Sequence, residues 1–121
     1  MTIYLAANKE YIITANNLAG SLKRDLSCKI SSNWHEPKHI TNPEKTIKAI
    51  CNADLVICFG ITAGKEKWLE VGIAYGYYKT IIALTSATFK DETDRLLDWI
   101  LMKRVSTYQE LINLIQDEIK I

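Results

Sequence analysis

A chain of 121 residues, 48% of them apolar, is long enough for one domain with a real hydrophobic core. Five glycines and two prolines are too few for a disordered or fibrous protein. The net charge of +1, from 15 basic and 14 acidic residues, excludes the strongly basic surface by which general nucleic-acid binders or proteins of anionic membranes attract their partners.

Apolar runs and helix-like patterns alternate along the first half of the chain. Residues 2–7 predict a short buried strand, and apolar residues recur at helical spacing from about residue 10 to residue 26. A weaker strand is predicted over 28–32. A second helix is predicted from Pro43, a residue suited to a first helical turn, to about Cys51.

The second half contains the clearest strand, 54–59, which is apolar at every position after the first, as in a parallel sheet covered on both faces. The remaining predicted elements are a loop (60–64), a helix (65–78), a buried strand (80–85), an ambiguous stretch (100–105) and a helix (108–119). Together these elements predict one α/β domain over residues 1–121 with a doubly wound parallel sheet. We expect a ligand at the carboxyl ends of the first and third strands.

The cysteines and histidines predict neither disulfides nor a metal site. Cys28, Cys51 and Cys58 are an odd number without Cys-x-x-Cys spacing, so we expect reduced, buried thiols. His35 and His39 lie in a loop region without a third ligand. The N-terminus has neither a basic segment nor a long apolar run, which predicts no secretory signal and no membrane span. With the reduced thiols, this indicates a cytoplasmic protein.

The helix predicted after the third strand has two unusual features. The loop before it contains two glycines, and the helix itself contains a glutamate between apolar residues. Gly60 and Gly64 let backbone approach a ligand, although such units also occur without one. Glu70 lies between the apolar residues Leu69 and Val71, where a carboxylate risks burial and therefore suggests a function. The alternative is an exposed glutamate paired with a lysine of the same helix.

Further residues could serve the same crevice. Asn8 follows the first strand and could contact a base or sugar, or cap a helix. Trp34 could stack on a base, or pack in the core or a subunit interface. Gly72 and Gly76 are poor helix formers, which predicts that another chain segment or a ligand packs closely against their helix.

Four segments, in this order, resemble the nucleoside 2-deoxyribosyltransferase-like superfamily: Ile3-Tyr4-Leu5-Ala6, Ala53-Asp54 before a buried strand, Glu70-Val71-Gly72-Ile73-Ala74, and Lys79 before the next strand. The resemblance covers most of residues 2–85. It implies a flavodoxin-like, five-stranded parallel sheet with helices on both faces. It also implies a small nucleoside or nucleotide as ligand, no cofactor, and a homodimer or larger homo-oligomer.

The same resemblance implies catalytic roles for two residues. Glu70 matches the carboxylate nucleophile that attacks C1′ of a 2′-deoxynucleoside, after which another base or water resolves the glycosyl-enzyme. Tyr4 matches a tyrosine that positions this nucleophile, whereas Asp54 is interpreted mainly as a strand-start residue. The candidate substrate-binding residues are Ala6, Asn8, Trp34, Gly60, Thr62, Gly64 and Lys65.

Gly64 departs from the family pattern. Six positions before the nucleophile, the family's transferases carry an acidic residue and its nucleotide hydrolases tend to carry a serine. Glycine has no side chain to recognise a sugar hydroxyl, and Lys65 could instead meet a phosphate. Three interpretations stay open: an N-glycosidic bond hydrolase or 2-deoxyribosyl transferase, a nucleotide-binding sensor without turnover, and an oligomeric structural protein with a vestigial site.

Overall fold

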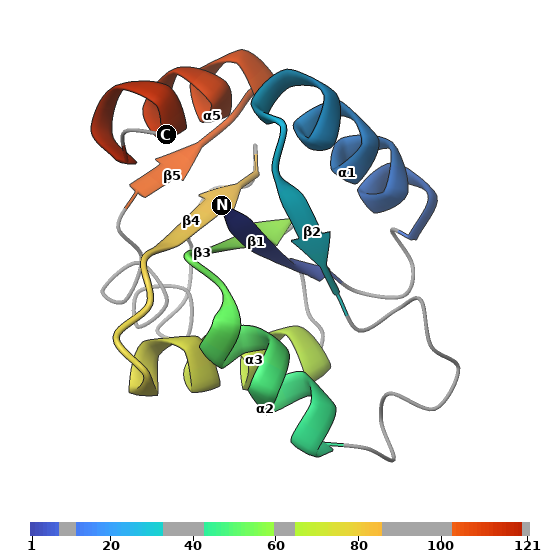
Figure 1. Ribbon diagram of the computed structural model, residues 1–121, viewed down its shortest axis with the longest axis vertical. Helices are drawn as coiled ribbons and strands as arrows, with labels where there is room; N and C mark the ends of the chain where they lie inside the picture. Colours follow the sequence, from blue (N-terminus) through green and yellow to red (C-terminus); the bar gives the residue numbers. More distant parts are fainter. Residues whose placement is uncertain (8–11, 33–42, 60–64, 86–102, 120–121) are drawn as a thin grey trace.

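The computed structural model describes residues 1–7, 12–32, 43–59, 65–85 and 103–119, and strands and helices alternate in the described residues up to residue 84 (Figure 1). The elements are β1 (Thr2–Ala7), α1 (Ile12–Leu26), β2 (Lys29–Ser31), α2 (Pro43–Asn52), β3 (Leu55–Phe59), α3 (Lys65–Gly76), β4 (Ile81–Leu84), β5 (Lys103–Val105), α5 (Tyr108–Leu114) and a π-helical end, η3 (Ile115–Ile119). Each corresponds to a predicted segment, and the ambiguous stretch at 100–105 contains a strand. The predicted loop at 60–64 lies outside the described residues.

The five strands form one parallel sheet in the order β2-β1-β3-β4-β5. β1 pairs with β2 on one side and with β3 on the other, so the direction in which strands are added reverses between β1 and β3. β4 and β5 then extend the sheet beyond β3. This is the strand order of flavodoxin-like sheets, and the predicted fold class is confirmed. Ligands of such sheets bind outside the carboxyl ends of the strands at this reversal.

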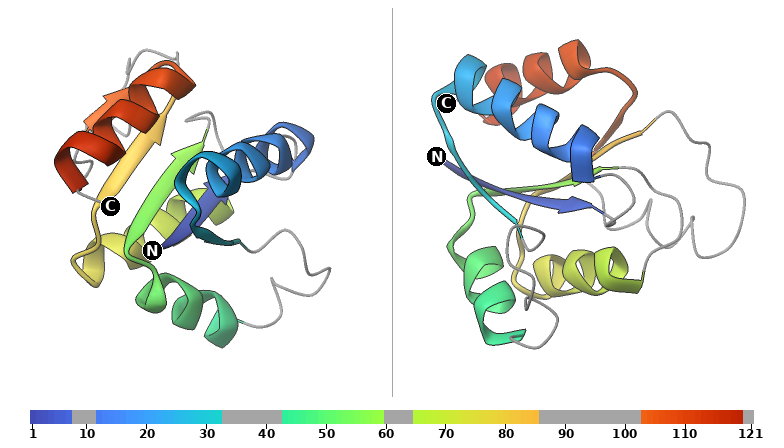
Figure 2. Two further views of the ribbon diagram at one scale, coloured as in Figure 1. Left: turned by 45° about the horizontal axis from the view of Figure 1, so that its top comes forward. Right: turned by 90° about the vertical axis from the view of Figure 1, so that its right-hand side faces the viewer.

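Helices cover both faces of the sheet, with α1 and α5 on one side and α2 and α3 on the other (Figure 2). This arrangement explains the uninterrupted apolar runs, because alternate residues of a strand point to opposite faces and both faces are buried. In β1, Ile3 and Leu5 belong to the core beneath α1 and α5, whereas Tyr4 and Ala6 belong to the core beneath α2 and α3. Strand alternation therefore places the Tyr4 side chain on the face that α3 covers.

Helix α3 ends in a Schellman-type cap in which a tyrosine occupies the left-handed position. Tyr78 has φ 58°, and the amides of Tyr78 and Lys79 donate to the carbonyls of Tyr75 and Ala74 at 3.0 and 2.9 Å. A residue with a Cβ is strained at this φ, whereas glycine is not. The strain is not offset by packing within the chain, since the Tyr78 side chain is 97% exposed.

We therefore expect Tyr78→Gly to raise the free energy of unfolding by about 1 kcal/mol, because it removes the left-handed strain. Urea unfolding followed by circular dichroism measures the change. Tyr78→Ala is the matched control, since it deletes the same ring but keeps the Cβ. An equal gain in both variants would assign the cost to the exposed ring instead of the backbone.

Candidate active site

Glu70 lies in the second turn of α3 and is only 2% exposed, although it is a charged residue. The inward face of α3 is set by Val71 and Ala74, which pack against the sheet. Glu70 precedes Ala74 by one helical turn and therefore points in the same direction, while Leu69 points to solvent. The alternative interpretation of Glu70 as an exposed glutamate is therefore wrong. Burying a carboxylate costs several kcal/mol of folding free energy unless nearby groups compensate. This cost is roughly as large as the whole free energy of unfolding of a domain.

Tyr4 is fully buried on β1 and is coupled electrostatically to Glu70. Burial raises the pKa of Tyr4 far above its usual value, and the negative charge of Glu70 and hydrogen bonding to it raise this pKa further. Within the described residues, the Tyr4 hydroxyl has no partner at good hydrogen-bond geometry, so we regard the contact as a close electrostatic approach rather than a well-formed hydrogen bond. Tyr4 therefore presents a neutral phenol, which can donate a proton to a hydrogen bond beside a carboxylate.

Small side chains form the row of the sheet that follows Tyr4 toward the carboxyl ends. Strand register aligns Ala6 with Cys58 on β3, and Cys58 with Ala83 on β4. All three are fully buried in the core beneath α2 and α3, together with Tyr4. Ala6, a predicted substrate-binding residue, thus lies beneath the surface and can shape the site only from below. Sequence analysis did not place Cys58 and Ala83 beside the candidate site, because only the pairing of distant strands aligns them with Ala6.

The remaining predicted substrate-binding residues are only partly covered by the structure. Lys65 is the first residue of α3, on the helix that carries Glu70. The others lie outside the described residues: Asn8, Trp34, Gly60, Thr62 and Gly64. In the sequence, these five positions follow the carboxyl ends of β1, β2 and β3, the edge at which a ligand is expected.

Two further positions of the family-like pattern have structural roles. The Asp54 carboxylate accepts a hydrogen bond from the Thr2 amide at 2.8 Å, and the Asp54 amide donates to the Thr2 carbonyl at 2.8 Å. This pair joins the starts of β1 and β3, which confirms the interpretation of Asp54 as a strand-start residue. The Lys79 ammonium donates to the Cys51 carbonyl at 2.8 Å and so caps the end of α2. Both contacts lie at the amino edge of the sheet, away from the carboxyl ends.

Asp54→Ala is expected to lower the free energy of unfolding by about 1 kcal/mol, because the exposed Thr2 amide exchanges its carboxylate partner for water. The melting temperature should fall by about 4 °C in differential scanning calorimetry. Asp117→Ala, at an exposed position near the C-terminus, is the control and should leave stability unaltered. A melting temperature of the Asp54 variant equal to that of the natural sequence would contradict the structural assignment.

The described residues contain no group of three or more histidine, cysteine or acidic side chains that could hold a metal ion. Cys28, Cys51 and Cys58 are free thiols, as predicted, but Cys51 is only partly buried. Within the same part of the chain, no helix has both the length and the apolar character needed to cross a membrane.

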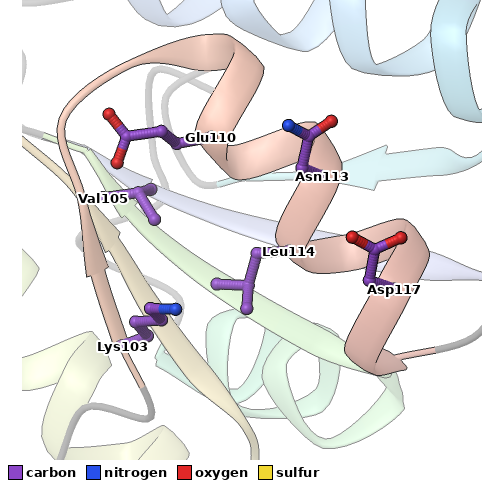
Figure 3. Close-up of a pocket in the computed structure, with 6 residues that line it drawn as sticks. All are labelled: Lys103, Val105, Glu110, Asn113, Leu114 and Asp117. Carbon is purple, nitrogen blue, oxygen red and sulfur yellow. The ribbon is translucent and has the colours of Figure 1, made fainter.

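A pocket between β5 and α5 lies apart from Glu70, at the edge of the sheet (Figure 3). Its lining residues are Lys103, Val105, Glu110, Asn113, Leu114 and Asp117. Its volume of about 230 Å³ is below the range of roughly 300–1,000 Å³ that is usual for small-molecule sites, and its polar lining residues are exposed. The buried Glu70–Tyr4 pair is therefore the stronger candidate for chemistry.

Two solved structures share this fold across nearly the whole chain. The 2-deoxyribosyltransferase of the psychrotolerant bacterium Bacillus psychrosaccharolyticus superposes with a TM-score of 0.72 and 18% identity, over 93% of this chain and 91% of that chain. The CMP N-glycosidase BcmB of Clostridium botulinum superposes with a TM-score of 0.63 and 19% identity, over 96% of this chain and 98% of that chain. At the level of sequence, no family model and no curated protein matches.

Proposed function

We propose that this chain, which has the fold of the nucleoside 2-deoxyribosyltransferase-like proteins, cleaves the N-glycosidic bond of a nucleoside or nucleoside monophosphate with Glu70 as nucleophile. The observation that carries the proposal is the burial of Glu70 against the neutral phenol of Tyr4. The two structures of similar fold belong to enzymes whose names place their chemistry at this bond, one a transferase and one a glycosidase. Their chemistry is the precedent for the reaction proposed here.

In the proposed first step, a Glu70 carboxylate oxygen bonds to C1′ of the sugar as the C1′–N bond breaks. The base leaves with the bonding electron pair and takes up a proton from solvent, so that a glycosyl ester of Glu70 remains. Water then attacks C1′ and releases a proton to solvent as the bond between C1′ and the Glu70 oxygen breaks, which restores the carboxylate and gives free sugar. A second base in place of water gives transfer. Splitting the reaction into two displacements is the strategy of retaining glycosidases.

Tyr4 has a positioning role in this scheme. Its phenol stays protonated because burial and the Glu70 charge raise its pKa, so it can only donate toward the carboxylate. A donor of this kind fixes the direction in which the carboxylate points. It also stabilises the charged form of Glu70, and the charged form is the nucleophile.

Hydrolysis is favoured over transfer by Gly64, which leaves no acidic side chain at the position where the family's transferases carry one. A 5′-phosphate on the substrate is expected near the amino end of α3, because unpaired backbone N–H groups at a helix start favour an anion. Lys65 is the first residue of that helix.

The proposal is tested by incubating the protein with deoxynucleosides, ribonucleosides and their 5′-monophosphates and measuring free base by liquid chromatography. Base release that disappears in Glu70→Ala supports the proposal. Glu110→Ala, which alters an exposed glutamate of α5, is the matched control and should retain full activity. Release that survives in Glu70→Ala would refute the mechanism. A nucleotide that raises the melting temperature without any base release would indicate a sensor, since a ligand at a hundredfold excess over Kd stabilises by about 2.7 kcal/mol.

A further inference from the structure

A second hydroxyl lies beside Tyr4 on the face of the sheet that α3 covers. Strand register pairs Ser31, the last residue of β2, with Tyr4 of β1. Paired residues of parallel strands point to the same face, and successive residues of one strand point to opposite faces. Ile30, the residue before Ser31, packs with the core beneath α1 and α5, which agrees with this direction. The Ser31 side chain therefore lies on the same face as the Glu70–Tyr4 pair.

The Ser31 hydroxyl oxygen is buried and has no hydrogen-bond partner in the described part of the chain. The hydroxyls of Tyr4 and Ser32 share this property. Ser32 follows the end of β2, so strand pairing does not fix the direction of its side chain. Burying a hydroxyl without a partner costs folding free energy, and native proteins retain such groups mainly where an ion, water or ligand completes them or where they have a function.

Hydroxyls that hold the fold together are paired elsewhere in the molecule. The Tyr108 hydroxyl donates to the Asp25 carboxylate at 2.6 Å, and the Thr107 hydroxyl accepts from the Glu110 amide at 3.2 Å. Ser31 makes no contact of this kind. An apolar side chain at position 31 would cover the sheet without the cost of a buried hydroxyl. The Ser31 hydroxyl is therefore better explained by a ligand than by a role in folding.

The position of β2 in the sheet indicates which part of a substrate Ser31 would meet. β2 and β3 lie on opposite sides of β1, and neighbouring strands are about 4.8 Å apart. In the proposed function, C1′ of the sugar lies at Glu70, and a 5′-phosphate lies near the start of α3, the helix that follows β3. The base is attached to the sugar ring at the end opposite C5′. It therefore extends away from β3, across Tyr4 and toward Ser31.

We propose that the Ser31 hydroxyl forms a hydrogen bond with the base of the bound nucleoside or nucleotide and so selects among bases. This inference rests on the proposed function, which supplies the position of the sugar. A serine hydroxyl can either donate or accept a hydrogen bond, so it can pair with a carbonyl, a ring nitrogen or an amino group of a base. A base without the matching group leaves the buried hydroxyl without a partner, and its binding is weakened for that reason.

The test compares the preferred substrate with analogues that each lack one polar group of the base. In the natural sequence, one analogue should have a kcat/KM about tenfold below that of the substrate. In Ser31→Ala, the substrate should lose this advantage, mainly through a higher KM, so that the two compounds react equally well. Ser21→Ala is the matched control, because it makes the same change on α1, on the opposite side of the sheet, and it should keep the tenfold preference (Figure 2).

Binding measured by isothermal titration calorimetry separates this inference from the proposed function. If no base is released, but Ser31→Ala weakens the binding of the tightest-binding nucleotide about tenfold and removes its preference over one analogue, the proposed function fails and the inference stands. If base is released and Ser31→Ala keeps every preference of the natural sequence, the inference is overturned and the proposed function stands.

Urea unfolding of Ser31→Ala tests the alternative of a structural role. Because no hydrogen bond within the described chain is lost, the free energy of unfolding should not fall. A clear fall would show that the fold itself uses the hydroxyl and would overturn the inference. A chain that binds none of these compounds would overturn both the inference and the proposed function.

Discussion

Replacing Glu70 with glutamine is expected to reduce the rate of base release by more than about 10³-fold while the protein stays folded. Glutamine has almost the same shape as glutamate, but its neutral amide is a far weaker nucleophile toward C1′. Stability should stay constant or increase, because a buried amide avoids the cost of removing a charge from water. Base release measured by liquid chromatography and urea unfolding measured on the same samples report the two effects.

A nucleophile is distinguished from a structural carboxylate when Glu70→Gln lowers the rate of base release but does not lower the free energy of unfolding. If Glu70 only held the fold together, Glu70→Gln would lower both quantities. Glu110→Gln is the control, because it makes the same chemical change at an exposed position of α5. Equal rates for Glu70→Gln and the natural sequence would contradict the assignment of Glu70 as nucleophile.

Tyr4→Phe is expected to lower kcat by about a hundredfold, the usual effect of losing one positioned hydrogen-bond donor, and to leave KM nearly unchanged. The free energy of unfolding should change by less than about 1 kcal/mol, because losing a buried hydroxyl without a well-formed hydrogen bond within the described residues offsets losing the donor that faces the Glu70 carboxylate. Steady-state kinetics and urea unfolding measure the two changes. Phenylalanine preserves the ring, so the core beneath α3 should not repack.

Tyr108 provides a control, because its hydroxyl has a structural role and removing it should affect stability instead of kcat. The Tyr108 hydroxyl donates a hydrogen bond to the Asp25 carboxylate at 2.6 Å and so joins α5 to α1 on the other side of the sheet. Tyr108→Phe should therefore lower stability and leave kcat unchanged. If Tyr4→Phe behaved like Tyr108→Phe, the Tyr4 hydroxyl would have a structural role only.

Much of the fold could be predicted because strands buried on both faces have a simple signature. Leu55–Phe59 and Ile81–Leu84 are continuous apolar runs, and their flanking helices show periodic patterns, so the parallel sheet followed from local sequence. The sequence of strand β5 does not identify it as a strand, because it lacks such an apolar run. It is a three-residue edge strand with Lys103 and Arg104 exposed, and charged edge strands have no hydrophobic pattern to detect.

The site was less predictable, because its key features depend on contacts between distant segments. Residues 69–71 are compatible with Glu70 on either face of the helix, and only the packing of Val71 and Ala74 on the sheet turns the carboxylate inward. The proximity of Tyr4 and Glu70 joins segments more than sixty residues apart in the chain, and the resemblance to a known family, instead of local pattern, suggested it. Five of the predicted substrate-binding positions lie outside the described residues and stay predictions.

The most direct test of the central claim, that Glu70 is the nucleophile, is mass spectrometry of the intact protein quenched during turnover. A substrate with fluorine at C2′ is suitable, because fluorine destabilises the oxocarbenium-like transition states and slows the breakdown of a glycosyl-enzyme. We predict a mass increase equal to the fluorinated sugar, located by peptide mapping on Glu70 and absent from Glu70→Gln. Base release with no adduct, or an adduct on a different residue, would contradict the claim.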